Sequence, residues 1–176
     1  MQKAVVTGGA GFIGSHLVDQ LINQGVEVII LDDLSTGKKE NINPKAKFVK
    51  YDISNIPQSL LVDYIKGADT IFHLAAKTTV QESIKDPILY NDVNVKGTLN
   101  LLKAATTIKI KRFVFSSSSS VYGNAAIPTP EAHTLNPISP YALNKLIGEQ
   151  YCKLYSDIYN LDTVCLRYFN VYGDRM

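Results

Sequence analysis

The sequence predicts an α/β fold in which a parallel sheet carries helices on both faces, the doubly wound arrangement. Along its 176 residues, short runs rich in β-branched side chains alternate with longer stretches of helical periodicity, which is typical of a parallel sheet. A glycine-rich segment lies between the first such run and the first helical stretch. The length suffices for one hydrophobic core, so we expect a single domain over residues 1–176.

Six strands and four helices are expected from this alternation. The expected strands are Lys3–Thr7, Glu27–Leu31, Lys47–Tyr51, Thr70–Leu74, Arg112–Ser116 and Thr163–Tyr168. The expected helices are Phe12–Asn23, Pro57–Ile65, Pro87–Ala105 and Pro140–Tyr159. Gly25 stands where the glycine that ends a helix belongs, whereas residues 33–46 show no clear helical period.

Charge and cysteine content argue against several classes of partner. The formal net charge of +2 is too small to predict binding to nucleic acid or to a membrane surface. Cys152 and Cys165 form no CxxC pair, and we interpret them as buried structural thiols. No apolar run approaches the ~20 residues of a membrane span. Because Met1 leads directly into a strand without a signal segment, we expect a cytoplasmic protein.

The histidines and serines show no pattern of a metal site or of a hydrolase. The spacing of His16, His73 and His133 does not suggest metal binding, and the Gly-x-Ser-x-Gly motif is absent. We expect His16 to pack in the first helix and His73 to be structural at the end of its strand. No metal is predicted.

The glycine-rich segment favours a dinucleotide site. Gly8 permits a tight turn, Gly11 lets the backbone approach a pyrophosphate, and Gly14 lets helix and strand pack closely. The helix that follows presents free N–H groups and the positive end of its dipole to phosphates. The glycine pattern favours a dinucleotide site because it lies after an expected strand and before an expected helix. The alternative interpretation is a glycine turn with a purely structural role.

Asp32 follows the second expected strand and indicates the type of dinucleotide. An acidic side chain there accepts hydrogen bonds from the hydroxyls of the adenosine ribose and repels a 2′-phosphate. NAD is therefore favoured over NADP. The alternative is a solvated aspartate at a strand end.

Tyr141 and Lys145 are four positions apart on an expected helix, so their side chains share one face. A neighbouring ammonium favours the phenolate and lowers the pKa of Tyr141 toward that of a general base, as the positive nicotinamide ring of NAD⁺ would also do. Ser118 lies just past the fifth expected strand. Because ligands of a doubly wound sheet bind beyond the carboxyl ends of the strands, all three side chains should reach the cleft that holds the glycine-rich loop.

Seven motifs occur in order along the chain and together resemble a known family. They are TGGAGFIGSHLVD (7–19), LDDLSTG (31–37), HLAA (73–76), NVKGT (94–98), SSSSSVYG (116–123), SPYALNK (139–145) and LRYFNVYG (166–173). This set is similar to the extended short-chain dehydrogenases/reductases that act on nucleotide sugars, especially the UDP-glucose 4-epimerase group. The resemblance covers essentially the whole chain and implies a Rossmann-type fold.

The resemblance implies NAD as the cofactor and a set of residues that bind it. These are Gly8, Gly11, Phe12, Ile13, Gly14, Asp32, Asp33, Leu34, Ser35, Thr36, Gly37, Asp52, Ile53, Leu74, Ala75, Ala76, Lys77, Asn94, Ser116, Tyr141, Lys145 and Phe169. It also implies that Ser118, Tyr141 and Lys145 are catalytic, and that Ser118, Tyr141 and Asn170 contact the substrate, a nucleotide sugar of the UDP type. The reaction implied is epimerisation at C4 through a 4-keto sugar.

The sequence departs from the family pattern in ways that bear on the reaction. Related dehydratases and decarboxylases carry acidic residues directly after the catalytic serine or threonine, whereas this chain has Ser119 and Ser120, which argues against both reactions. Galactose epimerases often have a lysine near Thr78, and here the lysine is Lys77. Another NAD-dependent reaction of a nucleotide sugar therefore stays open, as does a binding module without turnover.

Two further expectations concern assembly and completeness. The helices at Pro87–Ala105 and Pro140–Tyr159 match the pair that forms the dimer contact in the family, so we expect a homodimer. Family members continue beyond the motif that ends at Gly173 into a substrate-binding region. We therefore expect this region to be missing from residues 1–176, which would bind NAD with little turnover.

Overall fold

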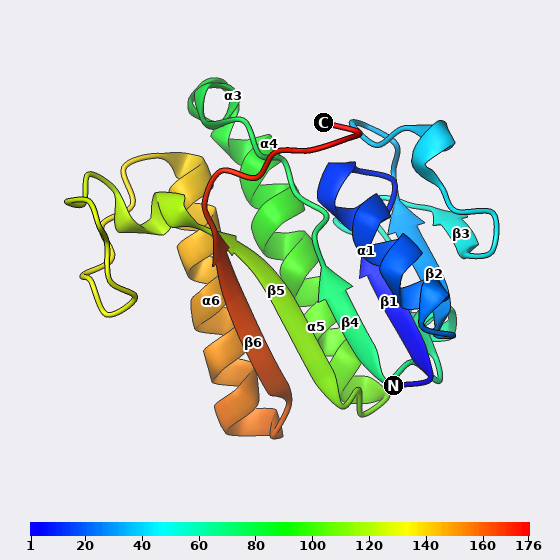
Figure 1. Ribbon diagram of the computed structural model, residues 1–176. Coiled ribbons are helices and arrows are strands. Elements are labelled where there is room, and N and C mark those ends of the chain that lie inside the picture. Colours follow the sequence, from blue (N-terminus) through cyan, green and yellow to red (C-terminus); the bar gives the residue numbers. More distant parts are fainter.

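A computed structural model describes residues 1–176 and contains one six-stranded sheet in which every neighbouring pair of strands is parallel (Figure 1). The strand order is β3-β2-β1-β4-β5-β6. The strands are β1 (Lys3–Thr7), β2 (Glu27–Asp32), β3 (Lys47–Lys50), β4 (Thr70–His73), β5 (Arg112–Ser118) and β6 (Asp162–Tyr168). The order reverses between β1 and β4, which places the switch point of the sheet beside the glycine-rich loop.

Helices connect all strands except β2 and β3. They are α1 (Phe12–Asn23), α2 (Gln58–Ile65), α3 (Val80–Lys85), α4 (Pro87–Asn91), α5 (Gly97–Thr107) and α6 (Pro140–Tyr159). A π-helical turn, η2 (Asp92–Lys96), joins α4 to α5, and two short 3₁₀ turns are η1 (Lys39–Asn41) and η3 (Ser119–Tyr122). None of these helices combines the length and the apolar character needed to cross a bilayer.

All six expected strands are present, and the doubly wound fold class is confirmed. The largest difference is at β5, which continues to Ser118 because Ser116–Ser118 pair with Leu166–Tyr168 of β6. Ser118 is therefore the last residue of the strand and does not lie beyond it. The expected helix Pro87–Ala105 is interrupted by the π-helical turn and ends two residues later, at Thr107.

The core has two layers of unequal extent. A cluster of 18 buried residues fills one face of the sheet, where α2, α5 and α6 contribute Leu61, Leu101 and Cys152. A smaller cluster of seven buried residues lies between α1 and the strands β1 and β2. In Figure 1, α5 and α6 lie behind the sheet and α1 lies in front, whereas no helix lies in front of β5 and β6.

Three local expectations have mixed outcomes. His73 is structural as expected, because it is buried between the hydroxyls of Thr7 and Thr98 and burial lowers its pKa to about 3. His16 lies in α1 and its ring meets that of Phe12 edge-on, as expected, but the residue is exposed and its Nε2 lies 2.8 Å from the carbonyl oxygen of Asp174. Cys152 is fully buried, but Cys165 is only partly so because β6 is an edge strand.

Helix α6 is fixed at its first turn and in its middle. Ser139 caps it by accepting a hydrogen bond from the Ala142 N–H at 3.1 Å, and Pro140 occupies the first helical position. Ser83 of α3 accepts the N–H of Tyr141 at 3.2 Å. In the middle, Gly148 lies directly against the ring of Phe115 on β5, so that no side chain fits between helix and strand.

Gly148→Ala should therefore destabilise the chain. A Cβ atom at this position would lie 2.4 Å from Cζ of Phe115, and neither the helix nor the buried ring has room to move. We expect the free energy of unfolding, measured by urea titration, to fall by about 1–3 kcal/mol. Gln150→Ala, an exposed change on the same helix, should stay within about 0.5 kcal/mol of the unmodified chain. Equal stability of the two variants would contradict this packing argument.

Candidate functional site

A cavity of about 910 Å³ opens at the carboxyl ends of the strands. The glycine-rich loop, the ends of β2, β4 and β5, the start of α6 and the segment after β6 line it. Of the site residues predicted from the sequence, all but Leu34, Gly37 and Asn94 lie on its wall. The parallel topology thus brings together side chains that are more than a hundred positions apart in the sequence.

The glycine-rich loop leaves no room for side chains at two of its predicted positions. Gly8 has a φ of +70°, and a Cβ atom there would lie 2.8 Å from the backbone nitrogen of Ala75 on the β4 side of the cavity. At Gly14, a Cβ atom would lie 2.1 Å from the carbonyl oxygen of Gly8. Only glycine at both positions lets the loop fold tightly over the start of α1 and turn its backbone toward the cavity.

Asp32 joins the end of β2 to the glycine-rich loop. Its Oδ2 accepts the N–H of Ala10 at 2.9 Å, and its Oδ1 accepts the N–H of Leu34 at 2.8 Å. Burial raises the pKa of this carboxyl group, and the two backbone hydrogen bonds oppose the shift because they favour the charged form. The carboxylate lies on the cavity wall with lone pairs left for a ligand.

The three predicted residues that miss the cavity wall lie behind it. Asn94 is buried in the π-helical turn, where its amide accepts the N–H of Lys77 at 2.8 Å and donates to the Lys77 carbonyl at 2.9 Å. It therefore holds the segment after β4 in place. Leu34 adopts a φ of +60°, and a Cβ atom at Gly37 would lie 2.8 Å from Oδ1 of Asp32. Both shape the loop that surrounds the aspartate.

Lys145 is buried beneath the far end of the cavity. Its Nζ donates to the carbonyl oxygen of Ser116 at 2.7 Å and lies 5.1 Å from the centre of the Phe115 ring. Only 5% of the residue is exposed, and this burial lowers the pKa of its ammonium group to about 8. The contacts of the Lys145 ammonium group are thus one carbonyl oxygen and the rings of Phe115 and Tyr141.

The pKa of Tyr141 is shifted in the direction opposite to the prediction. Burial raises it, and the hydroxyl group of Ser118 acts in the lowering direction. The ammonium of Lys145 lies 6.0 Å from the centre of the tyrosine ring, toward the carbonyl of Ser116, and does not outweigh the loss of solvent. The lowering expected from Lys145 is therefore not seen in this chain without a ligand, and the part expected from the positive nicotinamide ring of NAD⁺ stays a prediction.

Helix α3 and several further residues that complete the cavity wall were not expected from the sequence. Val80 contributes from the start of α3 and Thr78 from the segment before it, whereas Tyr168 and Tyr172 contribute from the end of β6 and the segment beyond it. The spacing Thr79-x-x-Glu82 is that of a capping box and was an available signal for α3. No comparable signal exists for the path of the C-terminal segment, which crosses above the sheet in Figure 1.

The buried ammonium of Lys145 predicts a pH-dependent contribution to stability. Its folded pKa of about 8 lies below the ordinary value of 10.5, so between these values the unfolded chain binds more protons. The free energy of unfolding should therefore rise with pH in this window, by about 3 kcal/mol relative to Lys145→Met, which does not titrate. Urea titrations at the two ends of the window measure this difference.

An exposed lysine supplies the control for this measurement. Lys103→Met on α5 removes a lysine that solvent already surrounds, so its stability relative to the unmodified chain should not change over the same window. If the Lys145→Met difference were equally flat, the ammonium would not be buried as the structure describes.

Comparison with known proteins is consistent with this geometry. The model of the NAD dependent epimerase/dehydratase family matches residues 4–176. The UDP-glucose 4-epimerase of Mycolicibacterium smegmatis is 44% identical over 98% of this chain and 57% of its own length. The solved UDP-glucose 4-epimerase of Thermotoga maritima, in complex with UDP-glucose, is 40% identical with a TM-score of 0.95, over 99% of this chain and 57% of that one.

The structural likeness extends to an enzyme with another reaction. The dTDP-glucose 4,6-dehydratase DesIV of Streptomyces venezuelae, solved with bound NAD, is 36% identical with a TM-score of 0.92, over 99% of this chain and 57% of that one. The chain spans about half the length of the curated relatives it matches. Because the family model covers nearly all of its residues, the chain belongs to the NAD dependent epimerase/dehydratase family, in agreement with the cofactor that the sequence predicts.

Proposed function

We propose that the complete protein containing this chain interconverts nucleotide sugars, most specifically UDP-sugars, by NAD-dependent epimerisation at C4. The observation that carries this proposal is the meeting of Ser118, Tyr141 and Lys145 in the same cavity as the glycine-rich loop. A proton-transfer group and a dinucleotide cradle side by side are what a reversible oxidation of a sugar hydroxyl requires. Residues 1–176 supply the NAD-binding domain in this proposal.

The residues of the cavity fit NAD. The side-chain-free backbone at Gly8 and Gly14 and the free N–H groups at the start of α1 suit the pyrophosphate. The carboxylate of Asp32 suits the adenosine ribose, and Asp52 and Ile53 on the cavity wall suit the adenine. Held by these residues, NAD⁺ would supply the reversible hydride acceptor that oxidation and reduction of the sugar carbon require.

Tyr141 is proposed to hold the proton of the sugar 4-hydroxyl during this exchange. The Ser118 hydroxyl next to the phenol can relay that proton and orient the substrate oxygen. Lys145 keeps a positive charge under the site, and bound NAD⁺ would add a second one. The two charges together would oppose the effect of burial and lower the pKa of Tyr141, which the chain's own groups do not achieve.

The residues after Ser118 favour epimerisation over elimination. Ser119 and Ser120 line the cavity where the related dehydratases and decarboxylases have acidic side chains, so no carboxylate is available there to remove a proton from the sugar ring. Asn170 is proposed to contact the nucleotide sugar because it lies on the cavity wall. Another NAD-dependent reaction of a nucleotide sugar and a binding module without turnover are the rival functions.

We also propose that the protein is a cytoplasmic homodimer that associates through Pro87–Ala105, which spans α4, η2 and most of α5, and through α6. Ile88 and Leu89 of α4 and Leu143, Leu154 and Ile158 of α6 are exposed apolar side chains on this pair of helices. Exposed aliphatic side chains gathered on neighbouring helices favour a protein contact. Light scattering over a range of concentrations tests it, and a monomer throughout would exclude this interface.

The role of Asp32 predicts the choice of cofactor. The unmodified chain should bind NAD⁺ more tightly than NADP⁺. Asp32→Ala should lower the ratio of the NAD⁺ affinity to the NADP⁺ affinity by about tenfold or more, because the charged hydrogen-bond partner of the ribose is lost. Both affinities should also weaken, since Asp32 holds the loop through Ala10 and Leu34. Calorimetry measures both, and Glu40→Ala, an exposed acid nearby in the sequence, should keep the ratio. Equal affinities in the unmodified chain would remove the ribose assignment.

The role of Tyr141 predicts a loss of catalysis without a loss of cofactor. In the complete protein, Tyr141→Phe keeps the ring and removes the oxygen that carries the proton, so kcat for UDP-glucose and UDP-galactose interconversion should fall by roughly 10²–10⁴-fold. NAD⁺ affinity should stay nearly unchanged. Tyr151→Phe, on the same helix but outside the cavity, should keep normal kcat.

This experiment also separates the rival functions. NAD⁺ binding without turnover of any nucleotide sugar by the unmodified complete protein would favour the binding module. Turnover that Tyr141→Phe leaves near normal would exclude Tyr141 as the base. Net oxidation of the sugar, with accumulation of NADH, would favour an oxidoreductase.

A further inference from the structure

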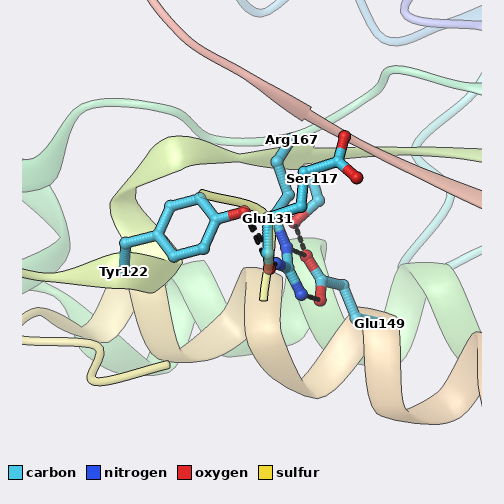
Figure 2. A network of polar contacts seen from close by, with 5 residues as sticks. All are labelled: Ser117, Tyr122, Glu131, Glu149 and Arg167. Atoms are coloured by element: carbon cyan, nitrogen blue, oxygen red, sulfur yellow. Dashed lines mark hydrogen bonds and ion pairs between the residues drawn. The ribbon is translucent and has the colours of Figure 1, made fainter. Parts of the chain in front are cut away.

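A partly buried polar network, drawn in Figure 2, is not used by the proposed mechanism, although it involves the residue before Ser118 and the helix that carries Tyr141. Ser117 donates its hydroxyl to Oε1 of Glu149. Arg167 binds the same carboxylate with two nitrogens, Nε at 2.9 Å and Nη2 at 2.7 Å. Its remaining nitrogen, Nη1, donates to the hydroxyl of Tyr122 at 2.8 Å and to the carbonyl of Glu131 at 3.1 Å.

The network joins the elements that carry the catalytic residues. Ser117 comes from β5, Glu149 from α6 and Arg167 from β6, and Figure 2 shows the three side chains meeting above the helix. Tyr122 and Glu131 add the η3 turn and the long loop before α6. Only Ser117 reaches the cavity wall, so Glu149 and Arg167 do not line the space for a ligand.

Three consecutive residues of β5 each contact a different residue of α6, and the two orders along the chain differ. Lys145 donates to the carbonyl of Ser116, Glu149 accepts the hydroxyl of Ser117, and Tyr141 faces the hydroxyl of Ser118. Tyr141, Lys145 and Glu149 are spaced four apart and therefore form one stripe on the helix. Three consecutive serines thus bind three successive turns of α6, and the two outer contacts involve proposed catalytic residues.

Stability alone does not explain this network. The side chains of Glu149 and Arg167 are only 8% and 23% exposed, and removing two charges from water offsets much of their attraction. An apolar pair of similar volume would fill the same space. The ion pair adds directional contacts. The bidentate contact of Arg167 and the hydrogen bond from Ser117 together fix how β5, α6 and the edge strand β6 lie relative to one another.

We propose that Ser117, Glu149 and Arg167 form a positioning network that sets the distance between Ser118 at the end of β5 and the catalytic face of α6. This inference rests on the proposed function of Tyr141 and Ser118. Ser117 and Ser118 are successive residues of β5, so holding Ser117 against Glu149 of α6 also fixes where the backbone places Ser118 relative to Tyr141 at the start of the same helix. Arg167 extends the same constraint to β6, whose next residues, Tyr168 and Phe169, line the cavity.

The experiment uses the complete protein with Ser117→Ala as the main variant. This change removes only the hydroxyl that links β5 to Glu149 and leaves the ion pair with Arg167 in place. We expect kcat to fall roughly tenfold or more, with KM and NAD⁺ affinity nearly unchanged, because a small displacement of a reacting group is costly. Ser117→Thr keeps the hydroxyl and should restore most of the rate. Glu149→Gln, which breaks the charge pair, should lower kcat at least as much.

A second readout does not depend on turnover. The ionisation of Tyr141 is followed by the ultraviolet absorbance of tyrosinate, taken as the difference between each protein and the same protein with Tyr141→Phe. The groups that face Tyr141 are the Ser118 hydroxyl on β5, Lys145 on α6 and Tyr90 on α4. If Ser117→Ala moves Ser118 away, the lowering effect of its hydroxyl is lost and Tyr141 should ionise at higher pH.

Asp162→Asn is the matched control, because Asp162 pairs with Arg112 across the same two strands at their opposite, exposed ends. It should leave both readouts unchanged. A folded Ser117→Ala protein with normal kcat and normal Tyr141 ionisation would overturn the proposal, as would equal effects of Asp162→Asn. If the unmodified protein turned over no nucleotide sugar, the proposed function would fail, and the tyrosinate titration alone would then decide the positioning role.

Discussion

The burial of the Lys145 ammonium is the constraint on which the rest of the site depends. Placing a charge under β5 with one carbonyl acceptor is unfavourable unless α6 meets the strand closely and in one register. Gly148 permits that close approach because it places no side chain between α6 and the ring of Phe115. The Ser139 cap and Pro140 fix the residue at which the helix begins. The position of Tyr141 one turn earlier is then a consequence of how Lys145 is held.

On the side of the cavity proposed for the cofactor, single residues both hold the loops in place and line the space for a ligand. Asp32 bonds two backbone N–H groups that connect β2 to the glycine-rich loop, and the same carboxylate faces the space proposed for the ribose. Lys77 donates to the hydroxyl of Ser35 at 3.0 Å, which joins the loop after β4 to the loop after β2. These contacts shape the cleft in advance, so a dinucleotide would meet a largely formed site.

The sequence predicted the elements whose signals are local. Strand runs, the glycine-rich loop and the Tyr141–Lys145 spacing depend on residues close together in the chain, and a parallel sheet brings their carboxyl ends to one edge. It did not predict the π-helical turn, which places Asn94 against the backbone of Lys77. Nor could it give the sign of the Tyr141 pKa shift, because that sign depends on burial by α4 and the sheet, which exists only after folding.

Fold likeness does not choose between epimerase and dehydratase, since solved structures of both superimpose on this chain almost equally well. The choice has to come from groups that touch the reacting atoms. Ser118 donates its hydroxyl to that of Ser120 at 3.1 Å and accepts the N–H of the same residue. The side chain two positions after the proposed catalytic serine is therefore in direct contact with it. An acid there would place a carboxylate, a competing proton acceptor, beside Tyr141, whereas the hydroxyl group of Ser120 places none next to the proposed base.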